Sequence, residues 1–313
     1  MIRGKSCIQI ASEDGWVNID QIVAAQPKMK RFCGSILDIL KASKEQRSNL
    51  SKAALDIPTD VQHPDKLLMP FQPLSYRDFM IYEHHAVNAA RGFAKRYIQA
   101  YPLTKLYEKI TGRPFPAFRP KPLWYRQPIY YMGNHLAFVP DGSTIPFPDY
   151  CDTLDYELEL GFVLAKPLLN ASPAEAEEAI GGFVIFNDLS VRNVQIAEMN
   201  SGFGPQKSKH FCNIIGSEVV TPEEVISNWQ SLKGEVRING RTVAEVSSNS
   251  PKYSLGEMLA HASKGEQLFP GEFFGTGTLP GGCGMENGYT LNPNDQLELV
   301  LHTIGSLKSK VQV

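Results

Sequence analysis

Three acidic residues alternate with apolar ones inside residues 154–166. Asp155, Glu157 and Glu159 occupy every second position of this stretch. Such alternation is typical of a β-strand with two unlike faces, and it would place Glu157 and Glu159 on one face, roughly 7 Å apart. Carboxylates on one face repel each other and lose hydration if they are buried. A divalent metal ion with oxygen ligands is the simplest way to offset them, and an edge strand that shows its acids to water is the alternative.

A second apolar run favours the buried interpretation. Residues 181–186 read Gly-Gly-Phe-Val-Ile-Phe, and Asn187 and Asp188 follow them. The run predicts a buried strand that delivers Asp188 at its C-terminal end. Asp188 is therefore a further candidate for a site made of carboxylates.

Length and charge restrict the classes of protein to which the chain can belong. Its 313 residues, 42% hydrophobic and 20% charged, indicate a globular protein with one large domain and a small one, or with two domains. The formal net charge of −2 gives no general attraction to nucleic acid or to an anionic membrane. No apolar run reaches the roughly 18 residues that span a bilayer. We therefore expect neither nucleic acid nor a membrane as a partner.

The N-terminus and the cysteines predict the compartment. The first residues, Met-Ile-Arg-Gly-Lys-Ser, lack the apolar core of a signal peptide. The five cysteines are scattered and contain no Cys-x-x-Cys pair, which favours reduced thiols packed in the core. Both observations predict a cytoplasmic protein.

The elements that must position the acids fall into two parts. Residues 1–73 predict a small N-terminal module and linker, with two strands around a turn at 13–15, a helix within 28–49 and a proline-rich linker over 55–73. Residues 74–313 predict the larger domain. Its start reads as a helix over residues 75–101, capped by Ser75 and with Asp78 in the first turn.

Short strands predominate after residue 113. Asn239-Gly240 predicts a hairpin with a type I′ turn, since both residues tolerate positive φ angles. A chain with many short strands and few helices favours an α+β fold, a mixed β-roll or β-sandwich with helices on one side.

Six short motifs follow one another in a recognisable order along the larger domain. They are Asp-Phe with a following His on residues 78–85, Glu-x-Glu on 157–159, Asn-Asp-x-Ser-x-Arg-x-x-Gln on 187–195, Lys-Ser on 207–208, Gly-Thr-Gly-Thr on 275–278 and a late Glu at 286. In this order they resemble the fumarylacetoacetate hydrolase family, over about residues 74–305. The resemblance implies the fold of that family's C-terminal domain and a homodimer.

The resemblance also implies a metal centre. The family binds one Mg²⁺ ion, or Mn²⁺ or Ca²⁺, through four carboxylates, which in this chain correspond to Asp78, Glu157, Glu159 and Asp188. The alternative for Asp78 is an ordinary acid at the start of a helix.

Catalytic roles follow from the same motifs. His85 takes the place of the family's general base, and Glu286 that of the acid that orients it. Arg192, Gln195 and Lys207 match positions that stabilise developing negative charge. The neighbouring Lys209 is a candidate for a surface salt bridge.

Four positions bear on substrate choice. Tyr131 and Thr278 match substrate-contact positions. Met80 stands where well-studied members carry a substrate-contacting Tyr, which suggests a more apolar substrate. Asn88 stands where related isomerases and decarboxylases use a Glu, and this difference favours hydrolysis.

The resemblance therefore implies a small diketo or keto acid as substrate. We expect hydrolysis of a carbon–carbon bond in a 1,3-diketone, an acylpyruvate or a fumarylacetoacetate-like acid, with the metal as Lewis acid. Decarboxylation of a β-keto acid, or isomerisation of a hydroxydienoate, is the alternative on the same site. A binding protein that kept the fold without the activity is a third interpretation.

Overall fold

The larger domain is built on a seven-stranded mixed sheet. The computed structural model describes residues 2–4, 8–59 and 67–312. The strand order of the sheet is β5-β4-β16-β9-β10-β12-β6, with β4 parallel to β16, β12 parallel to β6 and the other pairs antiparallel. The bounds are β5 Tyr130–Met132, β4 Tyr76–Phe79, β16 Phe273–Gly275, β9 Leu158–Leu164, β10 Ile180–Asn187, β12 Asn213–Ile215 and β6 Phe138–Pro140.

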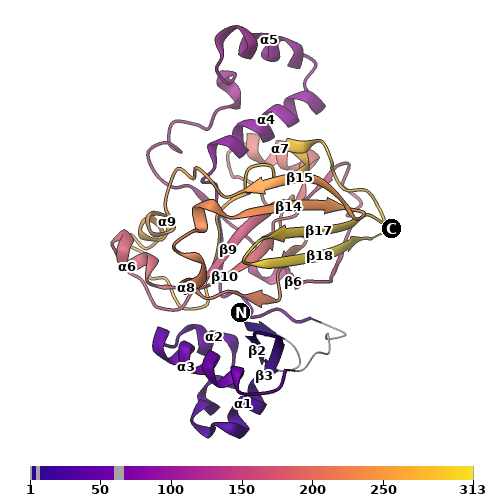
Figure 1. Ribbon diagram of the computed structural model, residues 1–313. Helices are drawn as coiled ribbons and strands as arrows, with labels where there is room; N and C mark the ends of the chain where they lie inside the picture. Colours follow the sequence, from indigo (N-terminus) through magenta and orange to yellow (C-terminus); the bar gives the residue numbers. More distant parts are fainter. Residues whose placement is uncertain (1, 5–7, 60–66, 313) are drawn as a thin grey trace.

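A five-stranded sheet packs against one face of the first, as Figure 1 shows for β14, β15, β17 and β18 in front of β9 and β10. Its order is β15-β14-β17-β18-β7, and its strands are β15 Arg241–Ser247, β14 Lys233–Ile238, β17 Gln296–Leu301, β18 Gly305–Val311 and β7 Thr144–Ile145. Phe162 and Ile185 from the first sheet share a buried core with Val236 and Leu299 from the second. The predicted α+β architecture of packed, curved sheets is therefore confirmed.

The N-terminal module covers the other face of the large sheet. Val184 and Phe186 of β10 pack with Ile36 and Leu40 of the module in a second buried core. Because β9 and β10 are buried on both sides, the alternation of acidic and apolar residues in 154–166 does not mark a solvent-exposed face and a buried face. Every residue of β9 is buried, and the alternation separates two interior faces.

The module contains the predicted strand pair, whereas the predicted helix within 28–49 is broken. Its sheet has the order β13-β1-β2-β3, with β1 Ile2–Gly4, β2 Ile8–Ser12, β3 Gly15–Asn18 and β13 Glu218–Val219 from the larger domain. The helices are α1 Ile19–Ala25, η1 Pro27–Phe32, α2 Ile36–Leu40 and α3 Lys44–Leu55. Ser35 and Ser43 cap α2 and α3 and so divide the stretch. Part of the predicted linker, residues 60–66, lies outside the described residues, and the domain boundary at 73/74 stays a prediction.

The predicted helix over residues 75–101 is wrong at its start. Tyr76–Phe79 is strand β4, all of it buried, and the Ser75 hydroxyl donates to Glu272 instead of capping a helix. Pairing with β16 and β5 on both sides decides the conformation, since tertiary pairing outweighs local preference. The helix begins later, as α4 Glu83–Tyr97.

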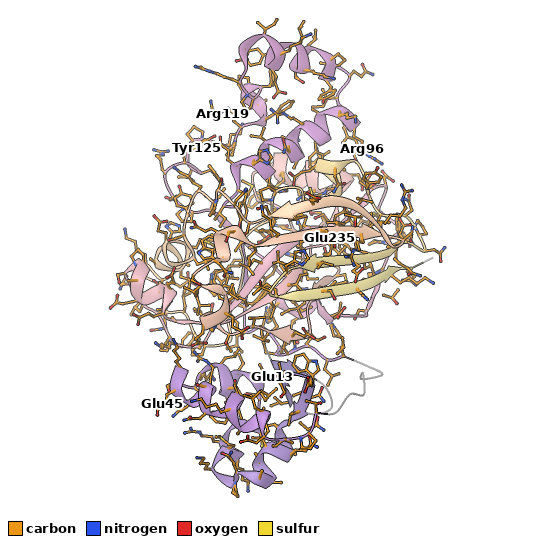
Figure 2. The ribbon with its side chains drawn as sticks, in the orientation of Figure 1. Glu13, Glu45, Arg96, Arg119, Tyr125 and Glu235 are labelled. Atoms are coloured by element: carbon orange, nitrogen blue, oxygen red, sulfur yellow. The ribbon has the colours of Figure 1, made fainter. Side chains whose placement is uncertain are left out.

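Helices α4 and α5 Tyr101–Thr111 form an arm that projects from the domain, at the top of Figure 1. Gly112 ends α5 in the left-handed conformation, which glycine adopts without strain. Figure 2 shows Arg96 at the end of α4, far from Glu13 and Glu45 of the N-terminal module.

The remaining elements connect and cover the sheets. They are β8 Leu154–Asp155, β11 Ser190–Val191, α6 Pro173–Glu177, α7 Arg192–Ser201, α8 Pro222–Val225, α9 Leu255–Ala262, α10 Gly284–Asn287, η2 Pro116–Phe118, η3 His135–Ala137 and η4 Trp229–Ser231. The hairpin of β14 and β15 turns at Asn239 and Gly240, whose φ angles of 52° and 77° confirm the predicted type I′ turn. Among the described helices, none is both long and apolar enough to cross a membrane.

Candidate metal centre and active site

Three buried carboxylates converge from three strands of the large sheet. Asp78 lies on β4, Glu159 on β9, and Asp188 directly after β10. One oxygen of each side chain lies within 4.8 Å of an oxygen of the other two. The convergence follows from the strand order β4-β16-β9-β10, because residues 78, 159 and 188 belong to near neighbours in one sheet.

The donor set and its surroundings fit a divalent cation. Asp78 Oδ1 and Glu159 Oε1 are buried without a hydrogen-bond partner. A Cβ at Gly275, on the strand between them, would lie 2.4 Å from Asp78 Oδ1 and 2.6 Å from Glu159 Oε2, so only glycine leaves both carboxylates in place. Oxygen atoms of buried carboxylates are the ligands that Mg²⁺, Mn²⁺ and Ca²⁺ prefer.

The pKa values of the clustered carboxyls also fit a cation site. Burial and the charge of Asp188 raise the pKa of Asp78 well above its usual range. Burial and the charges of Asp78 and Asp188 do the same to the pKa of Glu159. Carboxyls that resist ionisation in the absence of a cation are able to ionise when one binds.

Glu157, the fourth carboxylate of the predicted set, is held by two cations. Arg192 Nη1 lies 2.7 Å from Glu157 Oε1, and the Lys209 ammonium donates to Glu157 Oε2 and to Asp188 Oδ2. Burial opposes ionisation of Glu157, but Arg192 and Lys209 outweigh it and lower its pKa to about 2. The structure thus gathers three of the four carboxylates, with Glu157 beside them in an ion-pair network, and a four-carboxylate metal site stays a prediction.

The lysine prediction is corrected. Lys207 is exposed, and its Nζ lies 5.3 Å from the centre of the Tyr150 ring, outside the acid cluster. Lys209, taken from the sequence as a surface residue, is buried and bridges two of the acids. The Glu198 carboxylate accepts the backbone N–H groups of residues 206, 207 and 208 and fixes the turn that directs Lys209 inward.

Arg192 connects the acid cluster to a second group of residues. Its Nε and Nη2 lie 2.8 and 2.7 Å from Asp155 Oδ2, and its Nη1 donates to Gln195 Oε1 at 2.8 Å. Asp155 in turn accepts the backbone N–H groups of Gly284 and Met285 at 2.7 and 3.0 Å. Asp155 therefore holds the start of α10 and with it the position of residue 286. The sequence singled out Asp155 only by its place in the alternation, without this role.

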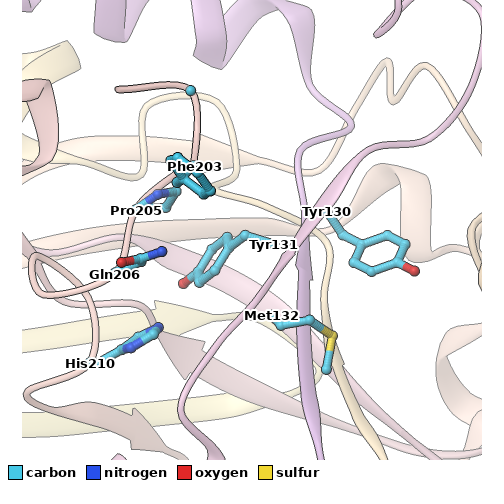
Figure 3. Close-up of a pocket in the computed structure, with 9 residues that line it drawn as sticks. Tyr130, Tyr131, Met132, Phe203, Pro205, Gln206 and His210 are labelled. Atoms are coloured by element: carbon cyan, nitrogen blue, oxygen red, sulfur yellow. The ribbon is translucent and has the colours of Figure 1, made fainter. Parts of the chain in front are cut away.

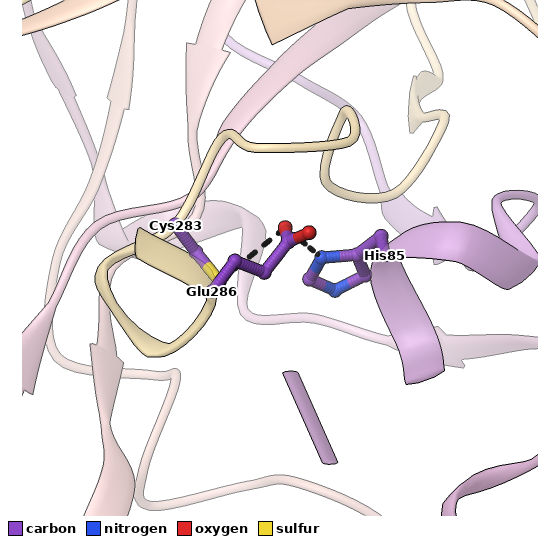
Figure 4. Close-up of side chains that lie close together, drawn as sticks. All are labelled: His85, Cys283 and Glu286. Atoms are coloured by element: carbon purple, nitrogen blue, oxygen red, sulfur yellow. Dashed lines mark hydrogen bonds and ion pairs between the residues drawn. The ribbon is translucent and has the colours of Figure 1, made fainter. Parts of the chain in front are cut away.

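His85 and Glu286 form a dyad (Figure 4), with side chains that are 9% and 3% exposed. His85 Nδ1 lies 2.7 Å from Glu286 Oε1, while Glu286 Oε2 accepts the backbone N–H of Gly281 at 3.2 Å. Cys283 Sγ lies 3.7 Å from Glu286 Oε1. A carboxylate at Nδ1 fixes the imidazole tautomer that leaves Nε2 free to accept a proton. The contact between the two residues matches the geometry expected from the sequence.

The predicted substrate-contact residues lie around the acids in different ways. The Tyr131 hydroxyl donates to Asp188 Oδ2 at 2.8 Å, and Tyr131 also lines a cavity (Figure 3). Thr278 is buried next to Gly277, whose N–H donates to Glu159 Oε2 at 3.0 Å. The Met80 backbone lies against Gly277, where a Cβ would approach Met80 Cα to 2.9 Å. Contact of these residues with a substrate stays a prediction.

Comparison with known proteins gives the same assignment as the motifs. The family model described as "Fumarylacetoacetate (FAA) hydrolase C-terminal" matches residues 82–312. The mitochondrial oxaloacetate tautomerase of Homo sapiens is 29% identical over 186 residues, which cover 59% of this chain and 81% of the tautomerase. The mitochondrial oxaloacetate tautomerase of Bos taurus is 28% identical over 186 residues, which cover 59% of this chain and 81% of that tautomerase.

Solved structures share the fold over the whole chain. A putative HpcE protein from Mycobacterium smegmatis superposes with a TM-score of 0.74 at 21% identity, covering 99% of this chain and 98% of that one. A fumarylacetoacetate hydrolase from Exiguobacterium antarcticum superposes with a TM-score of 0.69 at 19% identity, covering 100% and 98%. At these identities the likeness shows the fold alone.

Proposed function

This chain belongs to the fumarylacetoacetate hydrolase family, and on that premise we propose that it hydrolyses a carbon–carbon bond in a 1,3-diketone such as an acylpyruvate or a fumarylacetoacetate-like acid. The observation that carries the proposal is the His85–Glu286 dyad, built beside a cluster of buried acids that could hold a divalent metal. The substrate class is a small diketo or keto acid.

His85 acts as the general base. Glu286 holds Nδ1–H, so that Nε2 takes a proton from water, and the carboxylate then stabilises the imidazolium that forms. Charge at His85 also favours the ionised form of Glu157, so the dyad lies within electrostatic reach of the acid cluster. The hydroxide that forms adds to a ketone carbon of the substrate, the carbon–carbon bond to the other fragment breaks, and the imidazolium returns its proton to the carbon of that leaving fragment.

The acid cluster supplies the metal site. Asp78, Glu159 and Asp188 would hold the ion, with Mg²⁺ as the first choice and Mn²⁺ or Ca²⁺ as alternatives. When bound, such an ion polarises a ketone oxygen as a Lewis acid. Lys209 and Arg192 add positive charge next to this position and keep Glu157 ionised, which favours the build-up of negative charge on the substrate. Lys209 thus takes the part that the sequence suggested for Lys207.

A second candidate function is tautomerisation. Relatives 28–29% identical to this chain are named oxaloacetate tautomerases, and that reaction needs a base that removes a proton from carbon instead of from water. β-Keto acid decarboxylation or hydroxydienoate isomerisation would also use a stabilised enolate. Mass spectrometry of the products separates these reactions: hydrolysis adds the elements of water, decarboxylation loses CO₂, and the two isomerisations leave the mass unchanged.

The test is turnover of an acylpyruvate by the purified protein with Mg²⁺. We expect cleavage into two products, and we expect His85→Ala to reduce kcat by about 10²- to 10⁴-fold, the usual contribution of a general base. His84→Ala is the matched control, since His84 is the exposed neighbour on the same helix and should behave as wild type. Full activity of the His85→Ala protein would remove His85 from the mechanism.

One further outcome discriminates between an enzyme and a binding protein. Failure of the wild-type protein to bind Mg²⁺, Mn²⁺ or Ca²⁺ in calorimetry would favour a binding protein that kept only the fold. We also propose a homodimer, which light scattering of the purified protein tests directly.

A further inference from the structure

A cavity of about 590 Å³ opens beside the acid cluster. Its two walls come from β5 and from the loop after α7, and Figure 3 shows Phe203, Pro205, Gln206 and His210 along the loop, with the Tyr131 ring of β5 pointing towards them. The Tyr131 hydroxyl reaches Asp188. The loop wall is tied to the same acid, because Lys209, next to His210, donates to Asp188. A substrate with its reacting oxygens at the acids would therefore extend into this cavity.

The walls of the cavity are aromatic and apolar, with one amide and one imidazole among them. Tyr131, Met132, Phe203 and Pro205 supply apolar surface, and Gln206 supplies an amide. Neither Lys nor Arg is among the described residues that line the cavity.

The nearest buried cations are committed elsewhere. Lys209 pairs with Glu157 and Asp188, and Arg192 pairs with Asp155 and Glu157. A free carboxylate in the cavity would lose hydration without gaining an ionic partner, which is costly. A ketone or hydroxyl oxygen, in contrast, could bond to Gln206 or to His210 Nε2, which is buried without a partner.

Phe203 is the most exposed large apolar residue among those described, with 84% of its surface accessible, although it lies at the mouth of a cavity. Gly202 and Gly204 flank it with φ angles of 86° and 80°, and a Cβ at either would meet nothing within 4 Å. Glu198 holds the loop beyond Gly204 through its backbone N–H groups, whereas the Phe203 side chain is not packed against other residues. An exposed aromatic ring at the mouth of a cavity can bind an apolar group of a ligand.

We propose that the part of the substrate distal to its diketo group is an uncharged aromatic or bulky apolar group, received between Phe203 and Tyr131. The inference rests on the proposed function for the diketo end of the substrate, and it adds the chemical class of the group at the opposite end. A dicarboxylate such as a fumaryl diketo acid is then a poor substrate.

The experiment compares three 2,4-diketo acids that share the reacting end and differ in the tail: acetylpyruvate with a methyl, benzoylpyruvate with a phenyl, and fumarylpyruvate with a carboxylate. We expect kcat/KM for the phenyl tail to exceed that for the carboxylate tail by about tenfold or more. Phe203→Ala should raise KM for benzoylpyruvate about tenfold more than it raises KM for acetylpyruvate. Phe269→Ala is the control, because Phe269 is also exposed, at 54%, but does not line the cavity.

A gain-of-function variant tests the charge argument. Gln206→Arg places a cation in the wall and should raise kcat/KM for fumarylpyruvate while lowering that for benzoylpyruvate. Calorimetry of the three acids on the Mg²⁺-loaded His85→Ala protein measures the tail preference without turnover, so the inference can be judged even if none of the acids reacts.

The outcomes separate the two proposals. Turnover with equal or better use of the carboxylate tail would overturn the inference and leave the proposed function standing. Absence of any reaction would overturn the proposed function, and the order of the three dissociation constants would then decide the inference alone.

Discussion

His85 and Glu286 meet at 2.7 Å although 201 residues separate them in the chain. Their contact joins the start of α4 to α10, and Asp155 holds α10 in place through the N–H groups of Gly284 and Met285. Glu286, and through it the His85 ring, is therefore positioned by the same stretch that supplies Glu157 and Glu159. A change in that stretch would disturb the acid cluster and the His85–Glu286 contact together.

Removal of the Glu286 charge should lower the rate of the reaction without weakening substrate binding. We expect Glu286→Gln to lower kcat by about 10²- to 10⁴-fold with little change in KM, because the amide no longer stabilises the imidazolium. Steady-state kinetics on an acylpyruvate measure both constants. Glu178→Gln, at an exposed acid, is the control, and a proportional rise in KM would instead assign Glu286 to substrate binding.

The approach of α4 to α10 depends on Gly92. A Cβ at this position would lie 1.8 Å from the Met285 carbonyl oxygen, so Gly92→Ala must displace one helix from the other. We expect a loss in kcat of about 100-fold, the effect of a shift of about 1 Å in a catalytic group.

Alanine is the better helix former by about 1 kcal/mol, so loss of α4 itself cannot account for such a result. Circular dichroism should show unchanged helix content, and Lys95→Ala on the exposed side of α4 should retain full activity. Wild-type kinetics in the Gly92→Ala protein would show that the helix spacing does not set the position of His85.

Substitutions of two lysines that lie two residues apart should have very different effects on the free energy of unfolding. Lys209→Met leaves Glu157 and Asp188 buried without their shared cation, and we expect a loss of about 3–5 kcal/mol in the free energy of unfolding at pH 7. Lys207→Met removes an exposed charge and should change stability by no more than about 0.5 kcal/mol. Urea denaturation measures both, and the reverse order would contradict the placement of the loop.

The acid cluster predicts opposite effects of a substitution with and without metal. Glu159→Gln removes one of three mutually repelling carboxyls, so the metal-free protein should melt at a higher temperature than wild type. Mg²⁺ at about 100 times its dissociation constant should stabilise the wild type by about 2.7 kcal/mol and the variant by much less.

Thermal melts at matched pH, with and without Mg²⁺, give both quantities. Gly275→Ala should also abolish the metal response by displacing the carboxylates, whereas Asp149→Asn, at an exposed acid, should preserve it. A metal response that survives in the Glu159→Gln and Gly275→Ala proteins would place the ion elsewhere.

The dependence of stability on pH should change slope when metal is present. Burial and neighbouring carboxylates raise the pKa of Asp78 and Glu159, so their contribution is most favourable below the ordinary carboxyl pKa and is lost as the pH rises through the raised values. The metal-free protein should therefore lose stability as the pH rises above the ordinary carboxyl range.

Glu157 acts in the opposite sense. Its pKa falls from 4.5 to about 2, so its contribution is present above 4.5 and is lost as the pH falls towards 2. Saturating Mg²⁺ would replace the protons on Asp78 and Glu159 and should flatten the loss of stability above the ordinary carboxyl pKa. Parallel melting curves with and without Mg²⁺ across this range would contradict a cation site at Asp78 and Glu159.

Some features follow from the sequence because their causes are local. Alternating residues at 154–166, an apolar run that ends in Asp188 and an Asn-Gly turn each specify a strand or hairpin through neighbours a few residues away. The order of the motifs added the family and the pairing of His85 with Glu286, which the structure reproduces as a contact.

Other features depend on residues far apart in the chain. Asp78 lies on a strand because β16 and β5, formed by residues 273–275 and 130–132, pair with it on either side, and its local sequence suggested a helix. Lys209 instead of Lys207 enters the site because Glu198 fixes the intervening turn. The sequence by itself determined which groups were available for the chemistry; only the tertiary structure decided which of them are buried together, since pairing and burial depend on partners that local preference does not specify.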